Sequence, residues 1–136
     1  MTKISKNYKP TKKEKFMNAK MKEYFRQKLL DWKNELLKES SQTLVNLQKE
    51  ENTAKPDITD RASEEIERAF ELRTRDRERK LINKIDSALR RIDDGSYGYC
   101  EETGEPIGIK RLEARPVATL SLEAQEMHEE KEKKLN

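Results

Sequence analysis

The sequence predicts an all-α fold that is dominated by a long antiparallel coiled-coil hairpin and completed by a small head. Three observations support this fold. Of the 136 residues, only 32% are hydrophobic and 42% are charged, so the chain can bury a small core but not a large one. Two long segments repeat apolar residues at three- and four-residue steps, and a short segment around Pro56 separates them.

Residues 1–17 precede the first periodic segment and are predicted to form a flexible, basic amino-terminal segment. They have no apolar period, contain Pro10 and carry five lysines before position 14. Residues 1–40 together hold twelve Lys/Arg against five Asp/Glu. This basic character is compatible with a nucleic-acid-binding module and also with a solvated helix face.

Residues 18–50 predict the first helix. Asn18 is a favourable N-cap, because its side-chain oxygen can accept a hydrogen bond from a free amide of the first turn. One apolar stripe follows along the helix: Met21, Phe25, Leu29, Trp32, Leu36, Thr43 or Leu44, and Leu47.

The second helix begins near residues 57–60, after Pro56 has interrupted the first. Asp94 and Gly95 end it in a turn. Its expected stripe consists of Ala62, Ile66, Ala69 or Phe70, Leu81 or Ile82, Ile85, Leu89 and Ile92. Because the connection is short, the two helices should pair antiparallel as a hairpin over residues 18–96, with its tip at 52–62.

The second stripe stops between Leu72 and Leu81, where residues 73–80 read RTRDRERK. Neighbouring opposite charges could hold this segment as a solvated helix, at about 0.2–0.5 kcal/mol per pair. Alternatively, its arginines could contact a large partner, because guanidinium groups bond bidentately and tolerate partial burial.

Residues 97–136 are predicted to form the head, which consists of a Gly/Pro-containing knuckle and a last helix from about Thr119. A structural zinc site requires two close pairs of soft ligands, usually C-x2-C twice, and Cys100 is the chain's one cysteine. No zinc is therefore expected.

Packing is expected to stabilise the head in place of the metal. The candidate core side chains are Tyr97, Tyr99, Ile107, Ile109, Leu112, Val117, Leu120 and Met127. A lone buried thiol without a resolving partner is inert, so Cys100 is interpreted as structural, although chance metal binding by Cys100 and His128 stays open.

Four segments resemble the DksA/TraR family of RNA polymerase-binding transcription factors. They are GYCE at 98–101, IGIKRLEARP at 107–116, DITDRA at 57–62 and ELRTRDRERKL at 71–81. The resemblance covers roughly residues 15–130 and implies a zinc-ribbon-like knuckle, in which Cys100, Thr103, Ser121 and Ala124 hold the four places of the zinc ligands. Hydroxyl and methyl groups do not replace thiolates toward zinc, so the site is degenerate and this chain is a variant that lacks the four-cysteine zinc site. The resemblance also implies a regulator of transcription initiation that enters the secondary channel of RNA polymerase and acts with guanosine tetraphosphate (ppGpp) in the stringent response, repressing ribosomal RNA promoters.

Asp57 and Asp60 lie three residues apart at the expected tip. As first-turn acids they would cap the second helix and complement its dipole. One Asp suffices for capping, so the pair also suggests that acids are delivered to a partner. The resemblance implies that Asp57, Asp60 and Ala62 reach the neighbourhood of the polymerase active centre and that Arg77 contacts the polymerase.

The resemblance also implies a ppGpp site formed with the polymerase by Leu81, Lys84 and Arg115. Cations suit this ligand, because each charge-assisted hydrogen bond contributes about 1.5–3 kcal/mol. Gln125 stands where the family has a further basic residue, so the response to ppGpp is expected to be weaker.

No catalytic residue is assigned and the protein is not expected to be an enzyme, because a hairpin tip has no walls to exclude water around a metal. A transcript-cleavage cofactor similar to the Gre factors is the alternative, and it would have to borrow the partner's active site. The chain has no secretory or membrane-spanning segment and a single cysteine, so a cytoplasmic monomer is expected, without sequence-specific DNA binding.

Overall fold

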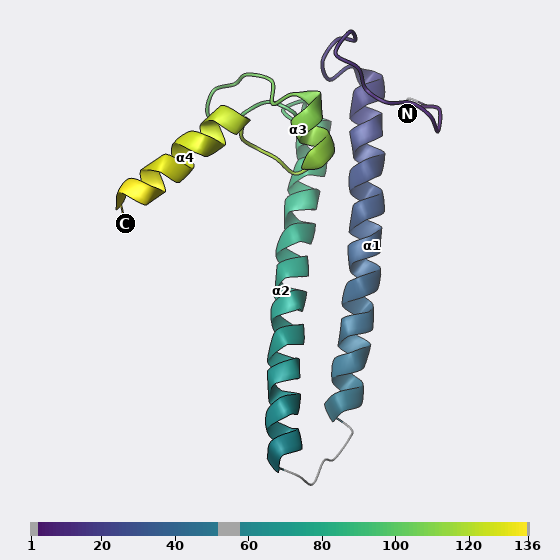
Figure 1. The fold of residues 1–136 in the computed structure, drawn as a ribbon. Coiled ribbons are helices and arrows are strands. Elements are labelled where there is room, and N and C mark those ends of the chain that lie inside the picture. The colour runs from purple at the N-terminus through teal and green to yellow at the C-terminus, as the bar shows by residue number, and fades with distance from the viewer. Residues whose placement is uncertain (1–2, 52–57, 136) are drawn as a thin grey trace. The chain divides into compact units, whose positions relative to one another are not determined.

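A computed structural model describes residues 3–51 and 58–135 and confirms the all-α fold. Its helices are α1 (Ala19–Glu51), α2 (Ile58–Asp94), α3 (Ile109–Ala114) and α4 (Leu122–Leu135) (Figure 1). The described residues contain no strand, only an isolated antiparallel bridge between Tyr99 and Pro106. None of the helices in these ranges is long and apolar enough to cross a membrane.

The chain divides into two compact units. The head unit comprises Met1–Leu30 and Ile85–Asn136, and the hairpin unit comprises Asp31–Lys84. The sequence pattern predicts a boundary between residues 96 and 97 instead. The difference arises because the amino-terminal part of α1 and the carboxy-terminal part of α2 share one core with the knuckle.

The core of the head unit confirms the apolar stripes at the base of both long helices. The most deeply buried large side chains are Met21, Phe25 and Leu29 of α1, Ile85 of α2, and Tyr97 and Leu112 of the knuckle region. Burial of each such side chain contributes about 1.5–3 kcal/mol before entropy is subtracted. Of the other expected knuckle residues, Ile107 is buried, whereas Tyr99 and Met127 are exposed.

Asn18 caps α1 as expected. The amide of Met21 donates to Asn18 Oδ1 over 2.9 Å, which satisfies one of the amides that the first helical turn leaves free. Met17, directly before the cap, has a φ of 55° and is buried. The chain therefore turns sharply at the start of α1, and its preceding residues fold back against the head unit.

This arrangement differs from the flexible segment that the sequence suggested for residues 1–17. Phe16 packs edge-on against Tyr99, with ring centroids 5.5 Å apart. Tyr8 packs edge-on against Tyr24 at 6.0 Å and donates its hydroxyl hydrogen to Glu14. The described part of the segment is thus held by aromatic contacts, which have no helical period and give no periodic signal in the sequence.

The knuckle is a tight loop in which both sides bond to each other. The Cys100 amide donates to the Glu105 carbonyl over 2.8 Å, and the Ile107 amide donates to the Gly98 carbonyl over 2.7 Å. The Tyr97 hydroxyl donates to the Pro116 carbonyl over 2.7 Å in the buried interior. These bonds fix the loop against the segment that follows α3.

The last helix begins three residues later than the expected start near Thr119. Ser121 precedes α4, and its hydroxyl oxygen accepts from the Ala124 amide over 3.2 Å. A hydroxyl at this position is a favourable helix cap. Ala124 is the buried residue of this helix, whereas Met127 and Leu122 are exposed.

In the hairpin unit, the described parts of α1 and α2 lie side by side within this one unit (Figure 1). The partly buried positions of α2 follow a seven-residue repeat, as in a coiled coil. Glu64, Glu71 and Glu78 occupy this repeat, and Ile85 and Ile92 continue it in the head unit. The seven-residue repeat of partly buried positions therefore continues through the hairpin unit, but glutamates occupy these positions there instead of isoleucines.

This register corrects the stripe expected for the first half of α2. Ala62, Ala69, Ile66 and Phe70 are exposed, the last two at 69% and 63%. They fall on a different side of the helix from the seven-residue repeat, because each residue advances about 100°. The Oε2 atoms of Glu71 and Glu78 are shielded from solvent and accept no hydrogen bond from the described residues.

Candidate functional site

The predicted tip lies largely at the edge of the described structure. Asp57 lies outside the described residues, and so does the expected tip segment before it. Asp60 belongs to the first turn of α2, and Ala62 is exposed.

An exposed stripe runs along α2 within the hairpin unit. Its members are Ile66, Phe70, Arg73, Arg77 and Lys84, and all are exposed. Their spacings of four, three, four and seven residues place them on one helix face. Two apolar anchors followed by three cations form a surface of the kind that protein partners bind, since aromatic residues and arginine are enriched in interfaces. This set is called the outer stripe below.

The outer stripe contains two of the residues that the sequence singled out, Arg77 and Lys84. Leu81 is half-buried and lies between the outer stripe and the seam that faces α1. Arg115 follows α3 in the head unit and is exposed. Gln125 lies on α4 and donates from its amide nitrogen to Glu129 over 3.3 Å.

Ile66 and Phe70 of the outer stripe were expected in the buried seam, because their four-residue spacing matches either face of a helix. The seven-residue step backward from Ile85 through Glu78 and Glu71 was the signal that could have separated the two faces.

Cys100 is buried in the knuckle, with 3% of its surface exposed. A hydrogen bond from the Thr103 hydroxyl, supported by the backbone amides of Ser121, Thr103 and Glu102, outweighs burial and lowers the pKa of the thiol to about 6. Hydrogen bonds to a charged form favour that form. The loop therefore stabilises a negative sulfur with its own donors.

The other three places of the zinc frame do not fit a zinc ion. Thr103 Oγ1 accepts from the Glu105 amide, Ser121 Oγ caps α4, and Ala124 ends in a buried methyl group. A tetrahedral zinc site requires thiolate, imidazole or carboxylate donors. The described residues contain no group of three or more such donors that could hold a metal ion. His128 is paired with Glu102, which ties α4 to the knuckle.

Two family models match the chain in succession. The model described as DnaK suppressor protein DksA, N-terminal domain, matches residues 21–92, and the prokaryotic dksA/traR C4-type zinc finger matches residues 95–130. The chain belongs to the DksA family. The second match covers the knuckle although three of its four cysteine positions hold other residues.

Relatives and a solved structure agree with this assignment. A protein of Caulobacter vibrioides named RNA polymerase-binding transcription factor DksA is 66% identical over 128 residues, covering 93% of this chain and 89% of the relative. The protein of the same name in Escherichia coli K12 is 44% identical, covering 90% and 80%. The structure of transcription factor DksA2 from Pseudomonas aeruginosa superposes with a TM-score of 0.81 at 42% identity, covering 87% of this chain and 90% of that one.

Proposed function

We propose that this chain binds RNA polymerase in the cytoplasm and regulates transcription initiation as a monomer that is not itself an enzyme. The observation that carries the proposal is its 66% identity over most of its length to a relative named RNA polymerase-binding transcription factor DksA. The outer stripe supports it, because exposed apolar anchors beside arginines are typical of a protein-binding surface.

In this proposal the hairpin tip enters the secondary channel of the polymerase. Asp57, Asp60 and Ala62 act near the active centre as an electrostatic and hydrogen-bonding probe that destabilises short-lived promoter complexes. Arg77 contacts the polymerase, and its place on the outer stripe agrees with this role. Guanidinium groups suit such a contact, since they bond carboxylates bidentately.

The alarmone ppGpp is the proposed co-regulator, held between the polymerase and Leu81, Lys84 and Arg115. Lys84 and Arg115 are exposed, so both can present their charge to a phosphate. Gln125 supplies no charge, and we expect weaker coupling to ppGpp than in relatives with a basic residue there.

The knuckle is proposed to work without zinc. The donors at its four frame positions do not fit the metal, and the bonds of Cys100 to Thr103 and to nearby amides take over the fixing of the loop. Dialysis against a zinc chelator should leave the thermal unfolding midpoint unchanged, whereas a shift of several degrees would contradict zinc independence.

In vitro transcription from a ribosomal RNA promoter tests the proposal, with and without ppGpp. Asp57→Asn and Asp60→Asn should lose inhibition while retaining polymerase binding, because each removes charge at the tip and leaves the outer stripe intact. Glu126→Gln, an exposed acid on α4, is the matched control and should inhibit like the wild type.

The proposal fails if the wild-type chain does not bind polymerase. The tip assignment fails if both variants inhibit as strongly as the wild type. Shortening of the transcript by stalled polymerase on addition of the protein would instead favour the cleavage-cofactor alternative.

A further inference from the structure

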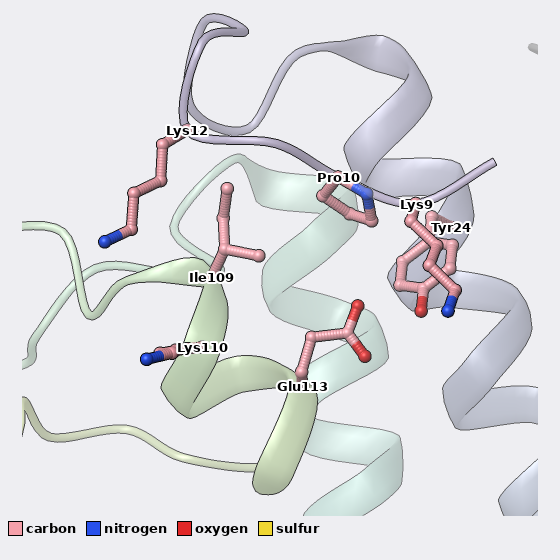
Figure 2. A pocket seen from close by; sticks show the side chains of 7 residues that line it. All are labelled: Lys9, Pro10, Lys12, Tyr24, Ile109, Lys110 and Glu113. Atoms are coloured by element: carbon pink, nitrogen blue, oxygen red, sulfur yellow. The ribbon is translucent and has the colours of Figure 1, made fainter.

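A pocket of about 380 Å³ lies in the head unit, and its lining includes none of the residues assigned above to the polymerase or to ppGpp (Figure 2). Its lining comes from three segments of this unit: the amino-terminal segment, α1 and the beginning of α3. The lining residues are Lys9, Pro10, Lys12, Tyr24, Ile109, Lys110 and Glu113.

The wall formed by the amino-terminal segment is held in place by specific contacts. Tyr8 packs on Tyr24, Glu14 accepts hydrogen bonds from Tyr8 and from the Asn18 amide group, and Met17 is buried. Pro10 and Lys12 lie between these anchored residues in the sequence, so the contacts hold the chain before and after them. The pocket is therefore a built feature of the head unit.

The one carboxylate in the pocket is already neutralised. Lys28 Nζ lies 2.7 Å from Glu113 Oε2, and Tyr24 also bonds to this carboxylate. Although partial burial raises the pKa of Glu113, the hydrogen bonds from Lys28 and Tyr24 outweigh it and lower the pKa. Glu113 thus stays ionised and bonded, and it contributes little net charge to the pocket.

The remaining charges are positive and lie mainly on one side. Figure 2 shows the Lys12 and Lys110 side chains on the same side of the pocket, with Ile109 nearer to them and Pro10 nearer to Lys9 and Tyr24. Lys12 and Lys110 are exposed and have no ion-pair partner among the described residues. An occupant should therefore place an apolar group on Pro10 and Ile109 and negative charge at the two lysines.

The aromatic ring in the pocket disfavours a stacked base as that occupant. Tyr24 is met edge-on by Tyr8 at 6.0 Å and by Phe25 at 5.2 Å, and Lys28 Nζ lies 5.9 Å from its centroid. Single-stranded nucleic acid is bound through open aromatic faces. The neighbours of Tyr24 crowd its ring, which leaves an acidic peptide as the better fit.

We propose that this pocket is a second docking site for RNA polymerase, separate from the hairpin, and that it takes an acidic polymerase segment carrying one apolar side chain. The apolar side chain packs on Pro10 and Ile109, and the flanking carboxylates pair with Lys12 and Lys110. This inference rests on the proposed function and extends it, because it assigns a role in polymerase binding to the pocket itself.

Charge reversal tests the site in the full-length protein. Lys12→Glu with Lys110→Glu should weaken polymerase binding about tenfold and reduce its dependence on salt, because rim charges mainly set the association rate. The matched control is Lys13→Glu with Lys131→Glu, which makes the same charge change at exposed positions outside the pocket and should bind within about twofold of the wild type.

A photo-crosslinking residue in place of Lys12 identifies the occupant. It should label a polymerase peptide with net negative charge, and competition by excess wild-type protein should remove the label. Equal losses in both double variants, or crosslinks confined to nucleic acid or to peptides without acidic residues, would overturn the inference. If the pocket variant binds like the wild type while the tip variants still lose inhibition, this inference fails and the proposed function stands.

Discussion

The head unit and the hairpin unit share the helices α1 and α2, yet they use the inner face of these helices differently. In the head unit the seam residues are apolar and buried, such as Phe25, Leu29 and Ile85. In the hairpin unit the same seven-residue repeat carries Glu71 and Glu78. Leaving a polar atom shielded and without a partner costs about 1–3 kcal/mol.

The two units therefore contribute differently: the head unit supplies most of the stability, and the hairpin unit carries the exposed outer stripe. The head unit gains most of the burial, whereas the hairpin unit keeps two large apolar side chains, Ile66 and Phe70, on the outside. Local stability follows buried apolar contact, so the hairpin unit should open more readily than the head unit.

The sharpest test of this comparison uses two leucines on α1. Leu29→Ala should lower the free energy of unfolding by about 2–5 kcal/mol, because Leu29 is fully buried in the head unit. Leu37→Ala, at a position 45% exposed in the hairpin unit, should change it by less than about 0.5 kcal/mol. Denaturant unfolding followed by circular dichroism measures both values. Similar losses would remove the contrast between the units.

A second test concerns the packing of the amino-terminal segment in the head unit. A Cβ at Gly98 would lie 3.1 Å from Met17 Cγ and 3.2 Å from Phe16 Cζ, whereas a Cβ at Gly95 meets nothing within 4 Å. Both glycines have positive φ, so alanine is strained at either position by about 1–2 kcal/mol.

Gly98→Ala should therefore destabilise the protein by about 1–3 kcal/mol more than Gly95→Ala, since only Gly98 is overpacked. Thermal unfolding of the two variants gives the difference. If both variants lose the same stability, residues 16 and 17 do not pack against the knuckle as described.

The cap of α1 should have a smaller effect. Asn18→Ala removes the acceptor for the Met21 amide and should cost about 1 kcal/mol. Asn83→Ala, at an exposed position inside α2, removes no cap and should be neutral or slightly stabilising. Urea unfolding midpoints compare the two, and a loss at Asn83 equal to that at Asn18 would contradict the capping role.

A pH dependence that comes from Cys100 forms a separate test. Its pKa is about 6 in the folded protein against an ordinary value of 9.0, so deprotonation favours folding. The stabilisation is complete above about pH 9 and is lost as the pH falls through about 6. The difference in unfolding midpoint between the wild type and Cys100→Ala should therefore shrink from pH 9 to pH 6. A difference that stays constant or grows would show that the thiol is not stabilised as an anion.

Most of the fold could be predicted from local chemistry. The Asn18 cap and the Gly95 turn define the start of α1 and the end of α2, because each acts through bonds or dihedral angles within a few residues. The seam of the first half of α2 could not be predicted, since Ile66 and Phe70 have helical spacing on whichever face they lie. The packing of Phe16 depends on Tyr99, which is too distant in sequence for a local pattern.

The exposure of the candidate site residues could be predicted in part. Arg77 and Lys84 are named by the family resemblance and stay predictions as functional residues, while the outer stripe that contains them depends on which face of α2 is buried. The pocket could not be anticipated, because Lys12 and Lys110 meet only once the amino-terminal segment has folded back on α3.

The head unit is assembled from both ends of the sequence, and this has a consequence for biosynthesis. Phe16 and Met17 leave the ribosome long before Gly98 and Tyr99, against which they pack. At 5–20 residues per second the delay is about 4–16 s. During that interval Phe25 and Leu29 lack part of their burial, so the nascent chain exposes an apolar helix that chaperones can bind. A product truncated before the knuckle would keep this helix exposed, which makes it a candidate for rapid proteolysis.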